Sequence, residues 1–263
     1  MKYDIAVIGG GVMGSATAYY LAKAGKKAVL IDQFPIPNSR SSSAGHSRIT
    51  RVANYGTPEL TAIMVDSKKE WNEIEKQAGM TLFKPALLLN VGPGDIPEIA
   101  ETLRRMAISI KDSGFEPEFP SIYEVNKRFG TTFPPNYKAV IDPSAGVLFA
   151  DKCLQAYQRL FVKNGGEILD SWPVTSISPG NTIMVTGPNG NITAKAVVIC
   201  PGSWAGPLLS MLGITIPVWV EKIGVFYWKI KKPELPKFTF IDISNGESHF
   251  YSLPDFEYPG YLK

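Results

Sequence analysis

The stretch Ile5-Ala6-Val7-Ile8-Gly9-Gly10-Gly11-Val12-Met13-Gly14 lies close to the start of the chain and decides its fold. It has the character of a strand, a glycine turn and a helix, and its glycines have the G-x-G-x-x-G spacing. In that spacing Gly9 permits a tight turn, Gly11 lets the backbone approach a pyrophosphate, and Gly14 lets the helix pack closely on the strand. The start of the helix then offers free N–H groups to the diphosphate.

A second apolar strand follows at the distance that a nucleotide-binding unit requires. Ala28-Val29-Leu30-Ile31 leads directly into Asp32, which stands 18 positions after Gly14. A carboxylate in this place can bind the hydroxyl groups of the adenosine ribose. The strand, helix, strand and acid together predict a βαβ unit that binds a dinucleotide.

The composition is that of an ordinary globular protein. Of the 263 residues, 44% are hydrophobic and 19% are charged, which argues against disorder and allows one large domain or two smaller ones. The net charge of +3 comes without a basic block, so we expect no nucleic-acid partner. The two cysteines, Cys153 and Cys200, and two histidines favour neither a disulfide framework nor a metal site.

The sequence also lacks the usual targeting and anchoring signals. It holds no apolar run of about 18 residues or more, so we expect no membrane partner. The chain opens directly on its first strand, and it does not end in the peroxisomal S-K-L address. From these features we expect a soluble protein of a reducing, intracellular compartment, which leaves a cytoplasmic location open.

Apolar periodicity divides the chain into helices and strands. We expect helices over 13–25, 59–78, 95–112, 121–129, 151–163 and 204–212, with Asp151 as a cap and Ser121 and Glu124 as a capping box. We expect strands over 3–9, 28–32, 86–91, 138–141, 146–149, 167–169, 173–177, 182–186, 192–200, 238–243 and 248–253, and long strands from residue 216 onward. Asn189-Gly190 is typical of a hairpin turn.

This order of elements predicts an α/β (α+β) fold with two discontinuous domains. We expect a Rossmann-like dinucleotide-binding domain over 1–85 and 140–215, and a mixed β-sheet substrate domain over 86–139 and 216–263. A loop rich in proline and serine, residues 34–47, follows the nucleotide-binding unit directly. A long loop in that place often carries function.

The end of this loop carries a family resemblance. Together with the glycine motif, Ser41-Ser42-Ser43-Ala44-Gly45-His46-Ser47-Arg48-Ile49-Thr50-Arg51 resembles the amine-oxidising flavoenzymes of the D-amino-acid oxidase superfamily. The sequence is most similar to the family of monomeric sarcosine oxidases and peroxisomal sarcosine/L-pipecolate oxidases. Further collinear matches are Asp142-Pro143-Ser144-Ala145-Gly146-Val147-Leu148, Pro201-Gly202-Ser203-Trp204, Tyr251-Ser252-Leu253-Pro254 and Glu257-Tyr258-Pro259-Gly260-Tyr261-Leu262-Lys263.

The resemblance implies FAD as the cofactor. It implies an enzyme of amino-acid catabolism that takes a hydride from the carbon beside a secondary amine, as in sarcosine or L-pipecolate. The resulting imine hydrolyses, and oxygen reoxidises the flavin and yields hydrogen peroxide. The partners would then be oxygen and a secondary amino acid with a carboxylate, and the resemblance also implies a monomer and, for the full-length form, a peroxisomal location.

The resemblance assigns four catalytic residues. Arg51 matches the arginine that binds the substrate carboxylate, a task suited to the guanidinium fork. Arg48 matches an arginine beside the flavin ring, where positive charge favours the anionic reduced form. Tyr251 matches a tyrosine of the substrate pocket. Lys263 matches a lysine beside the flavin that assists the reaction with oxygen, because a fixed cation stabilises developing superoxide.

The cofactor-binding residues come from the motif and from the same matches. Gly9, Gly11, Gly14 and Asp32 belong to the fingerprint, and Arg48, which matches an arginine beside the flavin ring, is counted here as well as among the catalytic residues. The resemblance adds Ser42, Ser43, Val174, Gly202 and Trp204. Among these, Val174 matches a position whose backbone contacts the adenine side of FAD, and Gly202 permits close approach of the backbone to the cofactor.

The sequence departs from the family pattern in two ways. The bacterial members have histidines near Ser43 and Ala44, and this sequence does not. Family members continue well beyond Lys263, and the further portion holds the cysteine that bonds to the flavin and a second lysine for the carboxylate. We therefore expect a fragment, a shortened isoform or an incomplete gene product that binds FAD weakly and is weakly active.

Two alternatives stay open on the sequence alone. The glycine motif is shared by NAD(P)-linked dehydrogenases, although the 41–51 loop and the β-rich insertions count against that class. A truncated product that binds nucleotide or a partner chain without turnover is the third hypothesis. Reduction of a bound flavin by substrate would distinguish the first hypothesis from the third.

Overall fold

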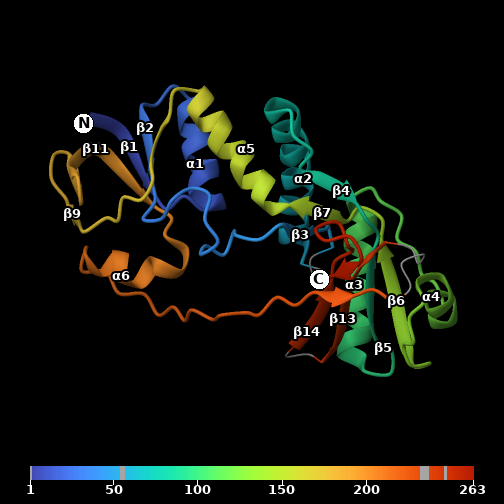
Figure 1. Ribbon diagram of the computed structural model, residues 1–263. Coiled ribbons are helices and arrows are strands. Elements are labelled where there is room, and N and C mark those ends of the chain that lie inside the picture. The colour runs from blue at the N-terminus through green and yellow to red at the C-terminus, as the bar shows by residue number, and fades with distance from the viewer. Residues whose placement is uncertain (1, 54–56, 232–236, 246–247) are drawn as a thin grey trace. The chain divides into compact units, whose positions relative to one another are not determined.

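The computed structural model describes residues 2–53, 57–231, 237–245 and 248–263. The chain divides into two compact units, each assembled from three separate stretches of sequence (Figure 1). Unit 1 comprises Met1–His46, Ile74–Met80 and Ala150–Ile223, and unit 2 comprises Ser47–Glu73, Thr81–Phe149 and Gly224–Lys263. The mixed α/β fold expected from the sequence is confirmed.

Unit 1 is built on a six-stranded sheet in the order β8-β2-β1-β11-β10-β9. The parallel part contains β1 (Lys2–Ile8), β2 (Ala28–Ile31), β8 (Glu167–Leu169) and β11 (Gly190–Ile199). An antiparallel hairpin extends one side with β10 (Ile183–Gly187) and β9 (Ser176–Ser178). All four residues of β2 are buried, as expected for a strand inside a parallel sheet.

Two helices pack together in unit 1. α1 (Val12–Lys23) follows the glycine turn, and it packs against α5 (Ala150–Lys163), as Figure 1 shows. Tyr19 of α1 is fully buried, and its hydroxyl donates to Gln77 Oε1 at 2.7 Å. A short 3-10 turn, η1 (Gly202–Trp204), leads into α6 (Ala205–Ser210), whose Leu208 joins the core formed by β1, β2, β10 and β11.

Unit 2 contains a four-stranded sheet in the order β14-β13-β5-β6. Its centre is β5 (Leu88–Pro93), which is buried along its whole length and pairs in parallel with β13 (Thr239–Asn245) and antiparallel with β6 (Tyr137–Asp142). β14 (Ser248–Ser252) pairs antiparallel with β13. In a second, three-stranded sheet, β7 (Gly146–Phe149) lies between β3 (Ser47–Thr50) and β4 (Phe83–Pro85). A separate two-stranded sheet is formed by β12 (Trp228–Lys229) and β15 (Tyr261–Leu262).

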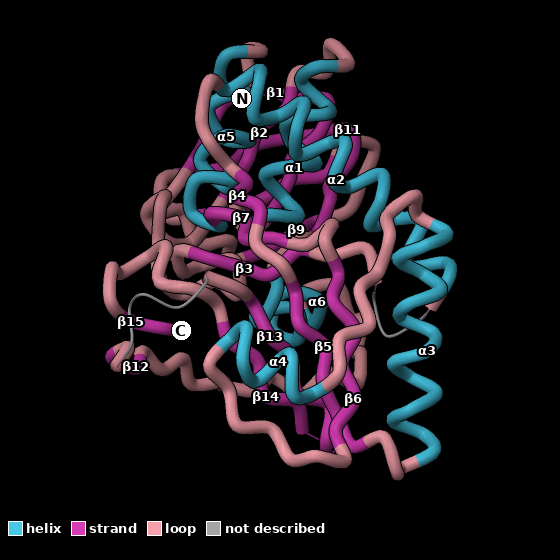
Figure 2. Tube along the Cα trace, turned by 90° about the vertical axis from the view of Figure 1, so that its right-hand side faces the viewer, coloured by secondary structure: helices cyan, strands magenta, loops and turns pink. Residues whose placement is uncertain are grey.

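Helices complete unit 2. α3 (Pro97–Asp112) runs alongside β5 and β6, and Figure 2 shows this arrangement. Its apolar face, which includes Leu103, Met106 and Ile110, forms one core with these strands. α4 (Ile122–Phe129) begins with the expected capping box, in which Ser121 Oγ accepts from the Glu124 N–H and the Glu124 carboxylate accepts from the Ser121 N–H. α2 (Pro58–Ala78) contributes residues to both units.

Three sequence-based expectations need correction. Within the described residues, 214–227 form no strand, because β propensity produces a strand only where a partner strand pairs with it. Asp151 is not a cap but lies inside α5, where its carboxylate pairs with His46. The domain bounds also shift. The stretches 47–73, 81–85 and 140–149 belong to unit 2, because β3, β4 and β7 form one sheet, and 216–223 belong to unit 1.

No helix in the described ranges is both long enough and apolar enough to cross a membrane.

Candidate functional site

The glycine turn at the end of β1 has the close contacts that its sequence predicts. Gly9 has a φ of 110°, and a Cβ there would stand 2.1 Å from the Cys200 carbonyl oxygen. A Cβ at Gly14 would stand 1.8 Å from the Gly9 carbonyl oxygen. Both positions therefore require glycine for the fold itself, because larger residues would collide with main-chain atoms.

Gly11 differs from the other two glycines of the motif. A Cβ at Gly11 would meet only Ser43 Oγ, at 3.3 Å, which is a tight contact with the end of one side chain rather than a collision with main-chain atoms. The N–H of Val12, the first residue of α1, donates to the same Ser43 Oγ at 3.0 Å. This open, polar surface at the start of a 12-residue helix suits the close approach of a diphosphate, so the residues present fit the dinucleotide.

Asp32 stands at the end of β2, beside the turn. Its Oδ2 accepts from the Gly10 N–H at 2.7 Å, and its Oδ1 accepts from the Phe34 N–H at 2.8 Å. These bonds fix the carboxylate at the carboxyl ends of β1 and β2, where parallel sheets bind nucleotides. Each carboxylate oxygen keeps a second lone pair for a ribose hydroxyl.

A polar contact below the turn could not be predicted from the motif. Gln158 of α5 is buried, and its Nε2 donates to the Gly10 carbonyl oxygen at 3.2 Å and to Ser15 Oγ at 3.3 Å. Ser15 Oγ donates to the same carbonyl oxygen at 3.1 Å. The turn is therefore held by side chains from α1 and α5. Nothing in the spacing of Gln158 indicates this role, because its partner lies 148 positions away.

The other expected cofactor residues of unit 1 lie near the same sheet, with different environments. Ser42 is exposed, whereas Val174 is half-buried and packs against the core beside β9. Gly202 has a φ of 55°, and a Cβ there would meet no atom within 4 Å. The Trp204 ring makes an edge contact with Phe34, with ring centroids 5.3 Å apart.

Two of the expected catalytic residues meet in unit 2, at the carbonyl oxygen of Ser47. Arg48 Nη1 donates to this oxygen at 2.7 Å, and Lys263 Nζ donates to it at 2.9 Å. The Lys263 side chain is only 8% exposed, so it is not a solvated terminal lysine. Burial lowers its pKa, the Glu257 carboxylate counteracts this, and the Arg48 guanidinium lowers the pKa further.

Arg51 lies just beyond β3 and is half-buried. Its Nε donates to the Ala53 carbonyl oxygen at 3.1 Å. The backbone N–H of Ala53 donates in turn to the buried carboxylate of Asp142 at 3.5 Å. Asp142 also accepts from the N–H of Ser144 at 2.8 Å. The Asp142-Pro143-Ser144 segment, which the sequence singles out without a role, thus supports the backbone that follows Arg51.

Tyr251 lies on β14 and faces Ile241 of β13 across the strand pair. Its side chain is 54% exposed, so it is open to a ligand rather than part of the core. It belongs to the four-stranded sheet, whereas Arg48 belongs to the three-stranded one.

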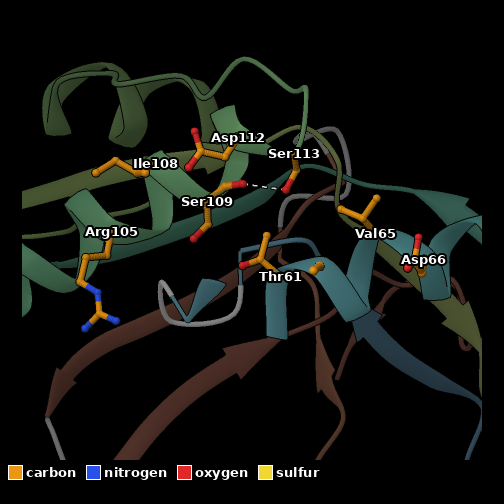
Figure 3. Close-up of a pocket in the computed structure, with 9 residues that line it drawn as sticks. Thr61, Val65, Asp66, Arg105, Ile108, Ser109, Asp112 and Ser113 are labelled. Atoms are coloured by element: carbon orange, nitrogen blue, oxygen red, sulfur yellow. Dashed lines mark hydrogen bonds between the residues drawn. The ribbon is translucent and has the colours of Figure 1, made fainter. Parts of the chain in front are cut away.

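A separate groove of about 530 Å³ lies between α2 and α3, and Figure 3 shows its lining. Thr61 and Asp66 come from α2, and Arg105, Ser109 and Asp112 come from α3. The lining includes none of the residues expected from the sequence to bind substrate or cofactor. Among the described residues, no group of three or more histidine, cysteine, aspartate or glutamate side chains is placed to hold a metal ion.

Comparison with known proteins gives a consistent assignment. Residues 4–258 match the model of the DAO family, described as FAD dependent oxidoreductase. The chain is 34% identical to the peroxisomal sarcosine oxidase of Mus musculus over 269 residues, which cover 99% of this chain and 67% of the mouse protein. It is 32% identical to the monomeric sarcosine oxidase of an Arthrobacter species, covering 97% of this chain and 66% of that protein. The chain thus spans about two thirds of the length of these relatives.

Solved structures share the fold. NikD, an unusual amino acid oxidase essential for nikkomycin biosynthesis, superposes in its open form with a TM-score of 0.88 at 20% identity, covering 99% of this chain and 68% of NikD. Glycine oxidase from Geobacillus kaustophilus gives a TM-score of 0.78 at 20% identity, covering 99% of this chain and 70% of that structure.

Proposed function

The chain belongs to the FAD dependent oxidoreductase family, and on this premise we propose that its function is that of an oxidase of secondary amino acids. The family membership selects FAD over NAD(P) as the cofactor. The observation that carries the proposal is the open surface at Gly11 beside a fixed Asp32 carboxylate, in a chain one third identical to sarcosine oxidases.

When bound in this site, FAD would supply the redox chemistry, namely acceptance of a hydride from the carbon beside the substrate nitrogen and reoxidation by oxygen to give hydrogen peroxide. The chain itself binds and orients. In unit 1, the N-terminus of α1 holds the diphosphate and Asp32 holds the ribose. Ser42, Ser43, Val174, Gly202 and Trp204 hold the remainder of the cofactor.

Unit 2 supplies the residues for the substrate. The Arg51 guanidinium binds the substrate carboxylate through two parallel hydrogen bonds, which fixes the position of the reacting carbon. The exposed Tyr251 ring forms part of the pocket wall. Arg48 adds positive charge that favours an anionic reduced cofactor, and the Lys263 ammonium stabilises developing negative charge on oxygen.

The substrate class follows from the relatives and from the carboxylate-binding arginine. We infer sarcosine or a cyclic secondary amino acid such as L-pipecolate. For the full-length form we propose a peroxisomal location, since the mouse and human relatives are named peroxisomal sarcosine oxidases. We also propose a monomer, as the printed names of the bacterial relatives suggest.

A spectroscopic experiment tests the proposal. The purified chain is loaded with FAD, and sarcosine, L-pipecolate or glycine is added without oxygen while the visible flavin absorbance is followed. We expect the secondary amino acids to bleach the flavin, and admission of air to restore the colour with release of peroxide. Binding of FAD without bleaching would instead favour a non-catalytic product, and absence of flavin binding would contradict the assignment of the Gly11 surface.

A further inference from the structure

Glu257 is a buried carboxylate shared by two partners. Its side chain is 3% exposed, and Oε1 lies 3.3 Å from Lys263 Nζ. The other oxygen, Oε2, accepts from the Tyr227 hydroxyl at 2.6 Å. A carboxylate loses its hydration on burial, and it stays charged there only when hydrogen bonds or an opposite charge replace that hydration. The contacts of Glu257 meet this requirement, so the pair with Lys263 is a buried, hydrogen-bonded ion pair rather than a surface one.

The contacts of Lys263 specify its protonated form. Its Nζ has three acceptors, the carbonyl oxygen and Oγ of Ser47, at 2.9 and 3.2 Å, and Glu257 Oε1, at 3.3 Å. An ammonium group has three N–H donors, whereas a neutral amine has two N–H groups and a lone pair. The three acceptors therefore match the charged form, although burial and Arg48 both oppose it.

Tyr227 is held as a hydrogen-bond donor. Burial raises the pKa of its hydroxyl, and the Glu257 carboxylate raises it further, so the phenol keeps its proton at neutral pH. The Tyr227 ring also makes an edge contact with Tyr258, with centroids 5.0 Å apart. The carboxylate of Glu257 is thus fixed on the side opposite Lys263.

We propose that Glu257, fixed by Tyr227, is the positioning residue that keeps the Lys263 ammonium charged and in place against Ser47. The groups that face this ammonium are the Glu257 carboxylate and the Arg48 guanidinium, together with the Ser47 oxygens. Glu257 is the negative charge in this set. Its consequence for catalysis rests on the function proposed above, in which Lys263 assists the reaction with oxygen.

The test measures Lys263 itself before any catalysis. The full chain is prepared with isotope-labelled lysine side chains, and the Lys263 signal, assigned with Lys263→Met, is titrated by NMR. We expect Glu257→Gln to move the midpoint to lower pH, and Glu257→Asp, which keeps the charge, to restore part of the loss. Glu98→Gln, which removes an exposed carboxylate on α3, is the matched control and leaves the midpoint unchanged.

A second variant covers the case in which Glu257→Gln does not fold. Tyr227→Phe removes only the hydroxyl, and we expect it to lower the midpoint in the same direction by a smaller amount. A midpoint that stays at the parent value in Glu257→Gln, or in Tyr227→Phe if the first variant is unfolded, overturns the proposal.

Flavin reoxidation separates this inference from the proposed function. With FAD bound and reduced, Lys263→Met is expected to slow the reaction with oxygen by about 100-fold or more. We expect Glu257→Gln to slow it by about tenfold at neutral pH, with the loss recovered as the pH is lowered. If Lys263→Met reacts normally, the proposed role of Lys263 is wrong, whereas the NMR titration still decides whether Glu257 positions it.

Discussion

Gln158, in the middle of α5, donates from Nε2 to the carbonyl oxygen of Gly10 at 3.2 Å, although 148 positions separate the two residues. The contact lies in the glycine turn where we propose that the diphosphate binds. Gly10 also donates its own N–H to Asp32 at 2.7 Å, so a single residue connects α5 to the expected ribose carboxylate. The geometry of the turn therefore depends on a residue outside the glycine motif.

We predict that Gln158→Leu weakens both folding and cofactor binding. The substitution keeps the volume but leaves the Gly10 carbonyl oxygen with Ser15 alone, which costs about 0.5–1.5 kcal/mol of unfolding free energy. Denaturant unfolding measures that loss, and titration with FAD measures the affinity. The half-buried Gln155→Leu on the same helix is the control. Equal behaviour of the two variants would show that the Gln158 contact is dispensable.

Two alanine substitutions distinguish glycines needed by the fold from the glycine needed by the cofactor. Gly11→Ala meets only the Ser43 hydroxyl, which must shift by a few tenths of an ångström, so we expect a loss of unfolding free energy of no more than about 1 kcal/mol. Because its methyl group would occupy the diphosphate surface, we expect FAD affinity to fall at least about tenfold. Gly14→Ala collides with the Gly9 carbonyl oxygen and should destabilise the fold by about 1–3 kcal/mol or more.

Denaturant unfolding and FAD titration on the same samples check this contrast. Unchanged FAD affinity in Gly11→Ala would contradict our assignment of the diphosphate site.

We predict that Arg51→Met chiefly weakens carboxylate binding. Losing a bidentate, charge-assisted pair should raise the dissociation constant of acetate, used as a simple carboxylate probe, by about 10- to 100-fold, with KM rising in parallel. Perturbation of the flavin spectrum by acetate measures this. Arg104→Met removes an exposed arginine that pairs with Glu101 on α3, and it should bind acetate as the parent does. If both variants bound acetate equally, Arg51 would not be the carboxylate residue.

Asp142→Asn should produce a weaker form of the same defect. The two oxygens of the buried carboxylate accept from the N–H groups of Ala53 and Ser144. The amide that replaces the carboxylate has only one oxygen, so it can accept at only one of these two positions. We expect a loss of about 1–3 kcal/mol in unfolding free energy and a modest rise in the acetate dissociation constant, because the backbone after Arg51 is less well held. A destabilised variant with unchanged acetate binding would limit Asp142 to a structural role.

Local patterns predicted the elements whose signals are short-range. The glycine motif, the fully apolar 28–31 strand and the Ser121–Glu124 capping box all act within a few residues, and each is found in the structure. The long strands expected from residue 216 onward rest on β-branched and aromatic composition alone. Trp219 is 76% exposed and Phe226 is 68% exposed, so these side chains do not pack into a sheet. A strand-like composition therefore does not by itself produce a strand, because a strand also needs a partner strand to pair with.

The residues of the candidate site also divide into those that the sequence predicts and those that only the structure reveals. Asp32 follows from its spacing to the glycines, but Glu257 and Tyr227 do not follow from any spacing, because the sequence cannot show which carboxylate meets Lys263 in space. The Ser47 carbonyl lies 216 positions from Lys263, and only the tertiary fold brings them together. Lys263 itself was expected from the family resemblance, and its burial is information that the structure adds.

The loop before Lys263 provides a prediction about pH. Asp255 is buried, and although burial raises its pKa, the Lys237 ammonium and the Gly260 N–H lower it below the usual value overall. The folded state therefore binds fewer protons than the unfolded state between the two pKa values. The resulting stability is complete above about pH 4 and is lost as the pH falls through the folded-state pKa. Because the Lys237 side chain is 51% exposed, solvent screening limits the contribution to about 1 kcal/mol.

We accordingly expect Asp255→Asn to be less stable than the parent at neutral pH by about this amount, with the difference shrinking toward acid pH. Denaturant unfolding at a series of pH values from about 3 to 7 measures both curves. Asp66→Asn is the matched control, because its partner Lys69 lies on the same helix and the Asp66 side chain is 78% exposed. A difference between Asp255→Asn and the parent that stays constant across this range would mean that the loop is held by packing rather than by the Asp255 charge.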